Sequence, residues 1–374
     1  MNNHDLSIEI FDRQTGFNFL SHGIIDDFKS CIVNWNAYSF NTFQLTLSVA
    51  TDYLLYFREN NIFSISDCYF YIDNIKYDST QSELMTITGK SLFGKGYKRI
   101  VMPPYSTNSA KPEKIIYDLI DKTMITTSSD NKLPYLAVQS PPDYGLVALS
   151  YQNSYGTVSD EITSLADSNQ ICIREVQTNL QNPAQEIQLY RGRDLSGDGG
   201  IEFSLKDDGL KSEAFVRDIS DQATVAHVFG EGEGAARKYV KVTRLPSNYD
   251  SLDVCEIYVD ARDLQQSYTT DSGQTVTLTD AQYKAQLTQR GVQALAERVE
   301  VLQLSGEVNF NNLNFRYGID YEVGDTVRVK SDKFGISKTS VLTSMQETWD
   351  ETGYHLDPTF DKDSATLIQK LKRK

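Results

Sequence analysis

One segment near the C-terminal end constrains the local structure of this chain most strongly. It comprises residues 314–330 (NFRYGIDYEVGDTVRVK). Gly318 and Gly324 interrupt it, and beyond them polar or cationic side chains alternate with Val327 and Val329. Because successive side chains of a strand point to opposite faces of a sheet, the pattern predicts a turn followed by a half-buried β-strand. Only another hairpin-like stretch follows, which favours a chain built for assembly over one built for catalysis.

Similar alternation recurs along the chain and predicts a mainly β protein with α+β inserts and two similar antiparallel β-barrels. Its 22 Tyr and 17 Phe favour strands, and 374 residues exceed one ordinary core. We predict a first β-barrel at 1–104, an α/β insert with two helices at 105–185, a second β-barrel from 186–245 and 303–360, an insert at 246–302 with a helix near 280–300, and a C-terminal tail at 361–374.

Three helices have recognisable start signals. Pro112 suits the first position of one helix, and Thr157 is expected to begin the second. Thr279 and Gln282 have the spacing of a capping box that starts the third. Gly291 would weaken this third helix by about 1 kcal/mol relative to Ala, so we expect a kink or an end there.

A weak internal repeat links two distant parts of the chain. Residues 60–65 (NNIFSI) and 324–329 (GDTVRV) share a turn followed by alternating apolar residues. A hairpin-like segment follows each of them, at 71–88 and 340–356. Two barrels of similar shape and a chance similarity between strand pairs account for the pattern equally well.

The charge argues against a protein that binds duplex DNA. The chain has 36 basic and 51 acidic residues and a net charge of −15, whereas DNA binding needs a Lys/Arg patch that displaces counterions. The acidity serves solubility, or it makes a surface that repels nucleic acid passing nearby. The first residues lack the features of a signal peptide, and no apolar run is long enough to span a membrane. The four widely spaced cysteines, without a C-x-x-C pair, suit synthesis in a reducing cytoplasm.

Residues 230–235 (GEGEGA) loosely match the glycine fingerprint of dinucleotide-binding proteins. That fingerprint needs a helix start after the loop, but residues 239–243 alternate like a strand. Glu231 and Glu233 would also repel phosphate groups. We therefore interpret the segment as a loop that permits close approach of another backbone.

Other candidate sites are weaker still. Residues 194–199 (DLSGDG) resemble half of a calcium loop, but Leu205 stands where a bidentate Glu is needed, so a turn is the better interpretation. The four His and four Cys are scattered without zinc or catalytic spacing. The 51 acidic residues always offer carboxylate pairs, and nothing marks one pair for glycoside cleavage. We predict no cofactor, no metal site and no enzyme.

Nine short segments follow one another in a characteristic order and spacing. They are 8–13 (IEIFDR), 87–92 (ITGKSL), 99–104 (RIVMPP), 150–156 (SYQNSYG), 217–220 (RDIS), 230–234 (GEGEG), 258–263 (YVDARD), 315–320 (FRYGID) and 353–360 (GYHLDPTF). Together they resemble the tail-associated, or baseplate hub, proteins of lactococcal-type siphophages that infect Gram-positive bacteria. These proteins are similar in turn to the central baseplate hub of contractile-tailed phages. Met102 stands where the family has a tryptophan.

The resemblance implies a homotrimer around a central channel. Two barrels per chain would make a ring of six units that docks on a sixfold distal tail protein ring and presents threefold symmetry below. The hub would close the tail channel in the virion and open it for DNA, which passes without specific binding. Tape measure protein and receptor-binding proteins are further implied partners.

We expect the functional residues to serve assembly. The candidates are Gly230, Glu231, Gly232, Glu233, Gly234, Tyr317, Asp320 and Tyr321. Ordinary turn and strand packing accounts for these residues at least as well. Two other functions remain open at this stage, a tail module that binds host-surface saccharide and an enzyme that digests the cell wall.

Overall fold

The computed structural model describes residues 6–15, 18–80, 83–128, 130–153, 155–180, 182–206, 209–269, 275–309 and 315–360. The predicted tail at 361–374 and Asn314 lie outside these ranges. Strands account for 44% of the structure and helices for 17%, which confirms the predicted mainly β class.

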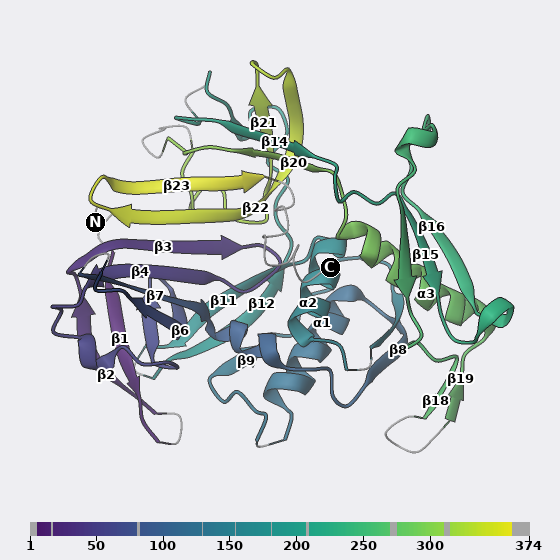
Figure 1. Cartoon of the computed structure of the whole chain (residues 1–374), viewed down its shortest axis with the longest axis horizontal. Coiled ribbons are helices and arrows are strands. Elements are labelled where there is room, and N and C mark those ends of the chain that lie inside the picture. The colour runs from purple at the N-terminus through teal and green to yellow at the C-terminus, as the bar shows by residue number, and fades with distance from the viewer. Residues whose placement is uncertain are drawn as a thin grey trace.

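One 13-stranded sheet dominates the molecule (Figure 1). Its N-terminal group comprises β1 (Ile8–Arg13), β2 (Phe19–Ile25), β3 (Phe28–Asn36), β4 (Thr42–Ser48), β5 (Ile62–Ile65), β6 (Cys68–Tyr77) and β7 (Leu84–Ser91). Its C-terminal group comprises β13 (Glu202–Phe203), β14 (Ala214–Asp218), β20 (Val301–Ser305), β21 (Thr326–Ser331), β22 (Ile336–Asp350) and β23 (Gly353–Phe360). The order is β14-β20-β23-β22-β3-β4-β7-β6-β5-β1-β2, with β21 joined to β13 and β22.

The two strand groups share this sheet because β3 pairs antiparallel with β22. No barrel closes among the described strands, which corrects the expectation of two closed barrels. Two backbone groups of β2 bond side chains instead of a closing strand. The Phe19 N–H donates to the Asn182 side-chain oxygen at 3.1 Å, and the Tyr53 hydroxyl donates to the Ile24 carbonyl at 2.8 Å.

Each strand group has its own aromatic core. In the N-terminal group, the Phe43 ring lies 5.3 Å from Phe63 and 5.5 Å from Phe70, and all three side chains are buried. In the C-terminal group, Phe203 lies 4.9 Å from Phe360 and is likewise buried. Burying each such side chain contributes about 1.5–3 kcal/mol. Trp349 of β22 also packs into the N-terminal core, so the two strand groups stabilise each other.

An α/β insert follows the N-terminal group and packs against it. Pro112 is the first residue of α1 and Thr157 is the N-cap of α2, as predicted. Ile116 and Leu119 of α1 and Ile162 of α2 are buried in one core. The insert comprises α1 (Pro112–Ile120), α2 (Val158–Asn169), β8 (Tyr105–Ala110), β9 (Leu136–Val138), β10 (Leu149–Asn153), β11 (Cys172–Asn179) and β12 (Ala184–Tyr190).

A second unit lies at the right-hand side of Figure 1, which we call the side unit. It comprises β15 (Val225–Phe229), β16 (Tyr239–Thr243), β17 (Glu256–Asp260), β18 (Ser267–Thr269), β19 (Thr275–Thr277) and α3 (Asp280–Ala296). The sheet order is β16-β15-β17. This pairing differs from the expected place of 186–245 in a second barrel, because β15 and β16 share a core with β17 and α3.

The third predicted helix begins as expected but ends later. Thr279 and Gln282 form the capping box, whereas Gly291 neither kinks nor ends α3. A Cβ atom at Gly291 would lie 2.6 Å from Val242 Cγ2 and 2.8 Å from Val228 Cγ2. Glycine is therefore present because the helix approaches β15 and β16 closely. Within the described residues, no helix has both the length and the apolar character needed to cross a membrane.

Candidate assembly site at two repeated corners

The two segments of the internal repeat fold alike. β5 pairs antiparallel with β6, which pairs with β7, and β21 pairs antiparallel with β22, which pairs with β23. Asn60 and Gly324 lie two residues before β5 and β21, and both have positive φ, 70° and 97°. Asparagine and glycine tolerate this left-handed conformation better than most residues. The repeated sequence pattern therefore corresponds to a repeated turn and strand pairing. We call the two turns the Asn61 corner and the Asp325 corner.

A neutral side chain fills the Asn61 corner. The Asn60 N–H donates to the Ile72 carbonyl at 2.8 Å, and the Ile72 N–H donates to the Asn61 carbonyl at 2.9 Å. The Asn61 residue is only 3% exposed. Its side-chain oxygen accepts the Arg13 N–H at 2.9 Å, and its amide nitrogen donates to an Asp12 carboxylate oxygen at 2.7 Å. One amide thus satisfies a backbone donor and a carboxylate together.

A charged side chain fills the Asp325 corner. The Gly324 N–H donates to the Leu342 carbonyl at 2.7 Å, and the Leu342 N–H donates to the Asp325 carbonyl at 2.9 Å, the same pattern as before. Asp325 is fully buried. Its carboxylate accepts the backbone N–H groups of Arg193 at 2.7 Å and Glu322 at 3.0 Å, and pairs with the Arg193 guanidinium at 2.5 Å.

Sequence reasoning missed Asp325 and Arg193. A signal for Asp325 was present, because it aligns with Asn61 in the two repeated segments, NNIFSI and GDTVRV. Arg193 had no such signal, since it lies 132 residues away from its partner. The corners are fixed by side chains from strand ends far away in the sequence.

Three of the predicted assembly residues lie in the turn that leads to the Asp325 corner. Tyr321 is 1% exposed, and its ring lies 5.2 Å from Phe203 and 5.6 Å from Tyr317. The Asp320 carboxylate accepts the Arg316 N–H at 2.7 Å. Burial raises the pKa of the Tyr321 hydroxyl. These contacts make the turn a rigid support for β21.

The predicted Gly230–Gly234 loop lies in the side unit, so the structure does not bring it together with Tyr317–Tyr321. A Cβ at Gly230 would lie 2.5 Å from the Tyr283 hydroxyl, which is the close approach that the glycine suggested. The Glu231 N–H donates to that hydroxyl at 2.8 Å, and its carboxylate accepts the Gln266 N–H at 2.9 Å. The element that approaches the loop is the chain's own helix α3.

The outer part of the same loop is exposed. Gly232 and Gly234 have positive φ of 105° and 52°, and Glu231 and Glu233 are exposed with them. A three-residue 3-10 turn, Gly234–Ala236, separates the loop from β16. The long helix that a dinucleotide site needs after its glycine loop is replaced by a strand, as predicted.

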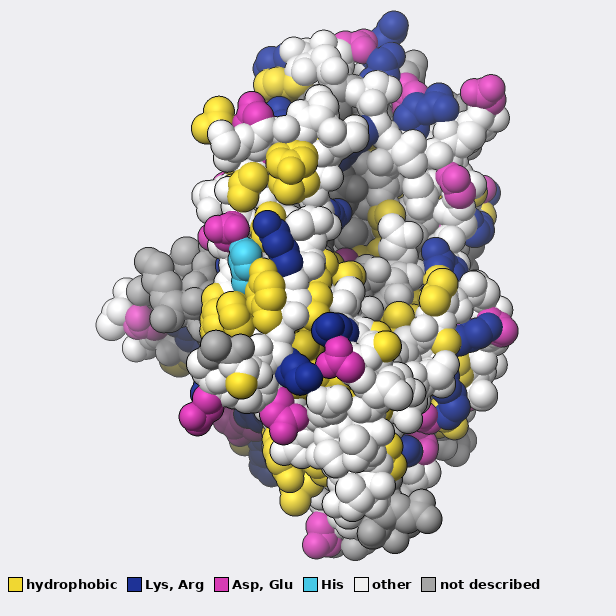
Figure 2. All heavy atoms as spheres, turned by 90° about the vertical axis from the view of Figure 1, so that its right-hand side faces the viewer, with side chains coloured by type: hydrophobic (Ala, Val, Ile, Leu, Met, Phe, Trp, Pro, Cys, Tyr) yellow, Lys and Arg dark blue, Asp and Glu magenta, His cyan; other side chains and the backbone are white. Residues whose placement is uncertain are grey.

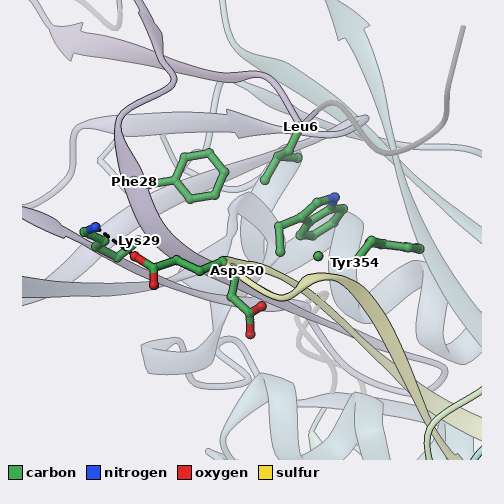
Figure 3. Close-up of a pocket in the computed structure, with 8 residues that line it drawn as sticks. Leu6, Phe28, Lys29, Asp350 and Tyr354 are labelled. Atoms are coloured by element: carbon green, nitrogen blue, oxygen red, sulfur yellow. Dashed lines mark hydrogen bonds and ion pairs between the residues drawn. The ribbon is translucent and has the colours of Figure 1, made fainter.

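A small hollow of about 290 Å³ opens beside the β22–β23 turn (Figure 3). Phe28, Trp349 and Tyr354 form its apolar wall, and the Trp349 and Tyr354 ring centroids lie 5.2 Å apart. The Lys29 ammonium pairs with Glu351 at 2.8 Å on its rim. The two charged groups on the rim are therefore paired with each other.

The described residues contain no cluster of three side chains suited to hold a metal ion. Cys31, Cys68 and Cys172 are buried, and burial raises the pKa of the Cys172 thiol to about 12. Such a thiol stays protonated near neutral pH and is a poor nucleophile. Cys255 is half-buried.

The sequence as a whole matches one known family. A model of the siphovirus ReqiPepy6 Gp37-like protein family matches residues 7–360. The chain belongs to this siphovirus family. No protein of curated function matches the sequence.

Solved structures of phage tail proteins share the fold of this Gp37-like family member. The tail protein from Neisseria meningitidis MC58 superposes with a TM-score of 0.55 at 11% identity, covering 96% of this chain and 97% of that one. The prophage MuSo2 43 kDa tail protein from Shewanella oneidensis gives 0.53 at 12% identity, with coverages of 95% and 98%. Prophage tail protein gp18 from Listeria monocytogenes EGD-e gives 0.53 at 11% identity, covering 98% of each chain.

Proposed function

We propose that this chain is the structural hub of a siphophage tail tip. The proposal rests on the family match over residues 7–360. It is supported by the fold, which tail proteins from three bacteria share over almost their full length. The hub is a component of the virion, synthesised in the host cytoplasm, and the host is a Gram-positive bacterium. The comparisons favour this structural role over a saccharide-binding module.

The hub assembles as a homotrimer that adapts a sixfold tail to a threefold tip. Support comes from the two corners, whose backbone hydrogen bonds and strand pairings repeat within one chain. The N-terminal and C-terminal strand groups act as two similar modules, so three chains present six modules to the distal tail protein ring. A division of the chain at residues 104, 185 and 302, with β15, β16, β17 and α3 kept together in the side unit, and the assembly role of Tyr317, Asp320 and Tyr321 belong to the same proposal.

The trimer closes the tail channel before infection and opens it for DNA. A net charge of −15 per chain supports passage without binding, because acidic walls repel the phosphate backbone. The tape measure protein and receptor-binding proteins are the other neighbours of the hub.

The mass of the purified full-length protein in solution tests the assembly. We expect a particle of three times 42.3 kDa by light scattering, up to the highest soluble concentration. A stable dimer, a stable tetramer or a monomer throughout that range contradicts the trimer. Incubation with peptidoglycan, followed by analysis of released sugars and peptides, tests the non-enzymatic role, and we expect no release.

A further inference from the structure

The sheet of the side unit has two very different faces. Ala226 and Val228 of β15 are fully buried toward α3. On the opposite face, strand alternation would ordinarily place polar side chains in contact with water. Instead this face carries Phe229, Tyr239 and Tyr258, one from each strand, and the two tyrosines are 42% and 60% exposed. We call these three residues the aromatic strip.

The strip crosses the three strands on a diagonal, because Tyr258 of β17 is level with His227 of β15 and not with Phe229. Phe229 pairs with Tyr239 in the antiparallel register, and its ring lies 5.0 Å from Tyr239 and 5.4 Å from Tyr258. The side of the molecule that faces the viewer in Figure 2 shows hydrophobic side chains gathered beside a histidine, with Lys and Arg side chains nearby. In the β15–β16 register, His227 lies next to the strip and its ring bonds the Tyr239 hydroxyl at 2.8 Å.

Arg237 is held over the strip. Its guanidinium carbon lies 5.3 Å from the Phe229 ring centroid and 5.8 Å from that of Tyr258. It donates to the Tyr258 hydroxyl at 3.1 Å and to the Asp260 carboxylate at 3.0 Å. A surface that is ordered before contact loses little side-chain entropy on binding. Tyrosine and arginine are also the residue types enriched in the energetic centres of protein interfaces.

The local charge of this face is opposite to that of the chain. Arg237, Lys241 and Arg262 lie on or beside this face with the carboxylates of Glu256 and Asp260, three cations against two anions, whereas the whole chain carries −15. An acidic surface of another copy is therefore attracted to the strip. Strip-to-strip contact would bring like charges together, so the complementary arrangement is head to tail, which makes a ring when the rotation between copies closes.

We propose that the aromatic strip binds an acidic surface of a second copy of this chain in a head-to-tail contact. The inference rests on the trimer proposed above and identifies one of its interfaces. It also gives the side unit a role, because this unit extends from the body of the molecule and offers the strip to a neighbour (Figure 1).

The test compares the full-length wild type with a Tyr239→Ser/Tyr258→Ser variant, and with Tyr249→Ser as a control. Tyr249 is 54% exposed and lies in the same unit outside the strip. We expect the double variant to raise the trimer's dissociation constant by about tenfold or more, as loss of an interface centre does, and the control to leave it unchanged. Circular dichroism confirms that each variant is folded.

A photo-crosslinking amino acid in place of Tyr258 provides a second measurement that does not depend on the variant's stability. Irradiation is expected to join two copies of the chain and to produce no such product when the residue replaces Tyr249. An unchanged trimer without self-crosslinking at position 258 overturns this interface and leaves the proposed trimer standing. A wild type that neither oligomerises nor self-crosslinks overturns both.

Discussion

The Asn61 corner and the Asp325 corner have the same backbone hydrogen bonds, but one is filled by a neutral amide and the other by a carboxylate. The difference follows from the neighbours. Asn61 donates to the Asp12 carboxylate, where a second carboxylate would be repelled, whereas Asp325 lies against the Arg193 guanidinium. Each corner therefore has a buried side-chain oxygen that accepts a backbone N–H. The charge of the neighbouring side chain decides whether that oxygen belongs to an amide or to a carboxylate.

Removing the acceptor should have the largest effect. Asp325→Ala removes a buried carboxylate and leaves the part-buried N–H groups of Arg193 and Glu322 without their acceptor, so we expect a loss of about 3–5 kcal/mol in unfolding free energy by urea titration. The control is Asp332→Ala, at an exposed residue of the same hairpin that contacts Lys330 at 3.4 Å. Equal losses in the two variants would contradict the importance of the corner.

Glu175 is a buried carboxylate whose pKa is raised, and no cation is among the groups that oppose the shift. Burial raises its pKa to about 7, and only hydrogen bonds from Ser91 and Phe93 oppose the shift. Because the pKa in the folded protein lies above the ordinary value of 4.5, stability is highest below pH 4.5 and falls as the pH rises to 7, by on the order of 3 kcal/mol. Glu175→Gln should remove this slope, which thermal unfolding between pH 4.5 and 7.5 measures. An unchanged slope would assign the pH dependence to other groups.

Exchanging the charge at the first corner should have a smaller effect. Asn61→Asp places a carboxylate beside Asp12, so we expect a loss of about 2 kcal/mol at neutral pH. Repulsion raises the pKa of the pair in the folded protein, so stability should recover as the pH falls. The double variant Asn61→Asp/Asp12→Asn should restore most of the loss, and no rescue would show that charge does not explain the choice of asparagine.

The exchange at the second corner should have the smallest effect. Asp325→Asn keeps an oxygen for the Arg193 N–H but places an NH2 group where the Glu322 N–H and the Arg193 guanidinium had an acceptor, so we expect a loss of about 1.5 kcal/mol. Denaturant titration beside Asp325→Ala measures the difference. A loss as large as that of Asp325→Ala would mean that the charge, and not the acceptor, holds this corner.

Local signals predicted local structure well. Pro112, Thr157 and the Thr279–Gln282 pair marked helix starts correctly, because capping depends on residues within one turn. Gly291 was misjudged because its reason lies in Val228 and Val242, which approach the helix from strands distant in sequence. The same limit applies to strand pairing, since β15 and β16 looked like barrel strands but form a separate sheet in which β15 lies between β16 and β17.

In the candidate site, too, the local features were visible in the sequence and the long-range contacts were not. The repeated segments at residues 60–65 and 324–329 were visible in the sequence, whereas the glycine-rich loop, which was expected to admit another backbone, is approached at Gly230 by the side chains of Tyr283 and Leu287. The partners of Asn61 and Asp325 were not visible, because Arg13 and Arg193 are brought to the corners by long-range folding.

By itself the sequence determined the mainly β class, the helix starts, the positive-φ positions before β5 and β21 and the acidic surface, since each depends on neighbouring residues or on composition. The tertiary structure alone decided that both strand groups share one open sheet through β3 and β22, and that the aromatic strip lies on an exposed face. Alternation tells which residues share a face, but only the packing of α3 determines which face is covered.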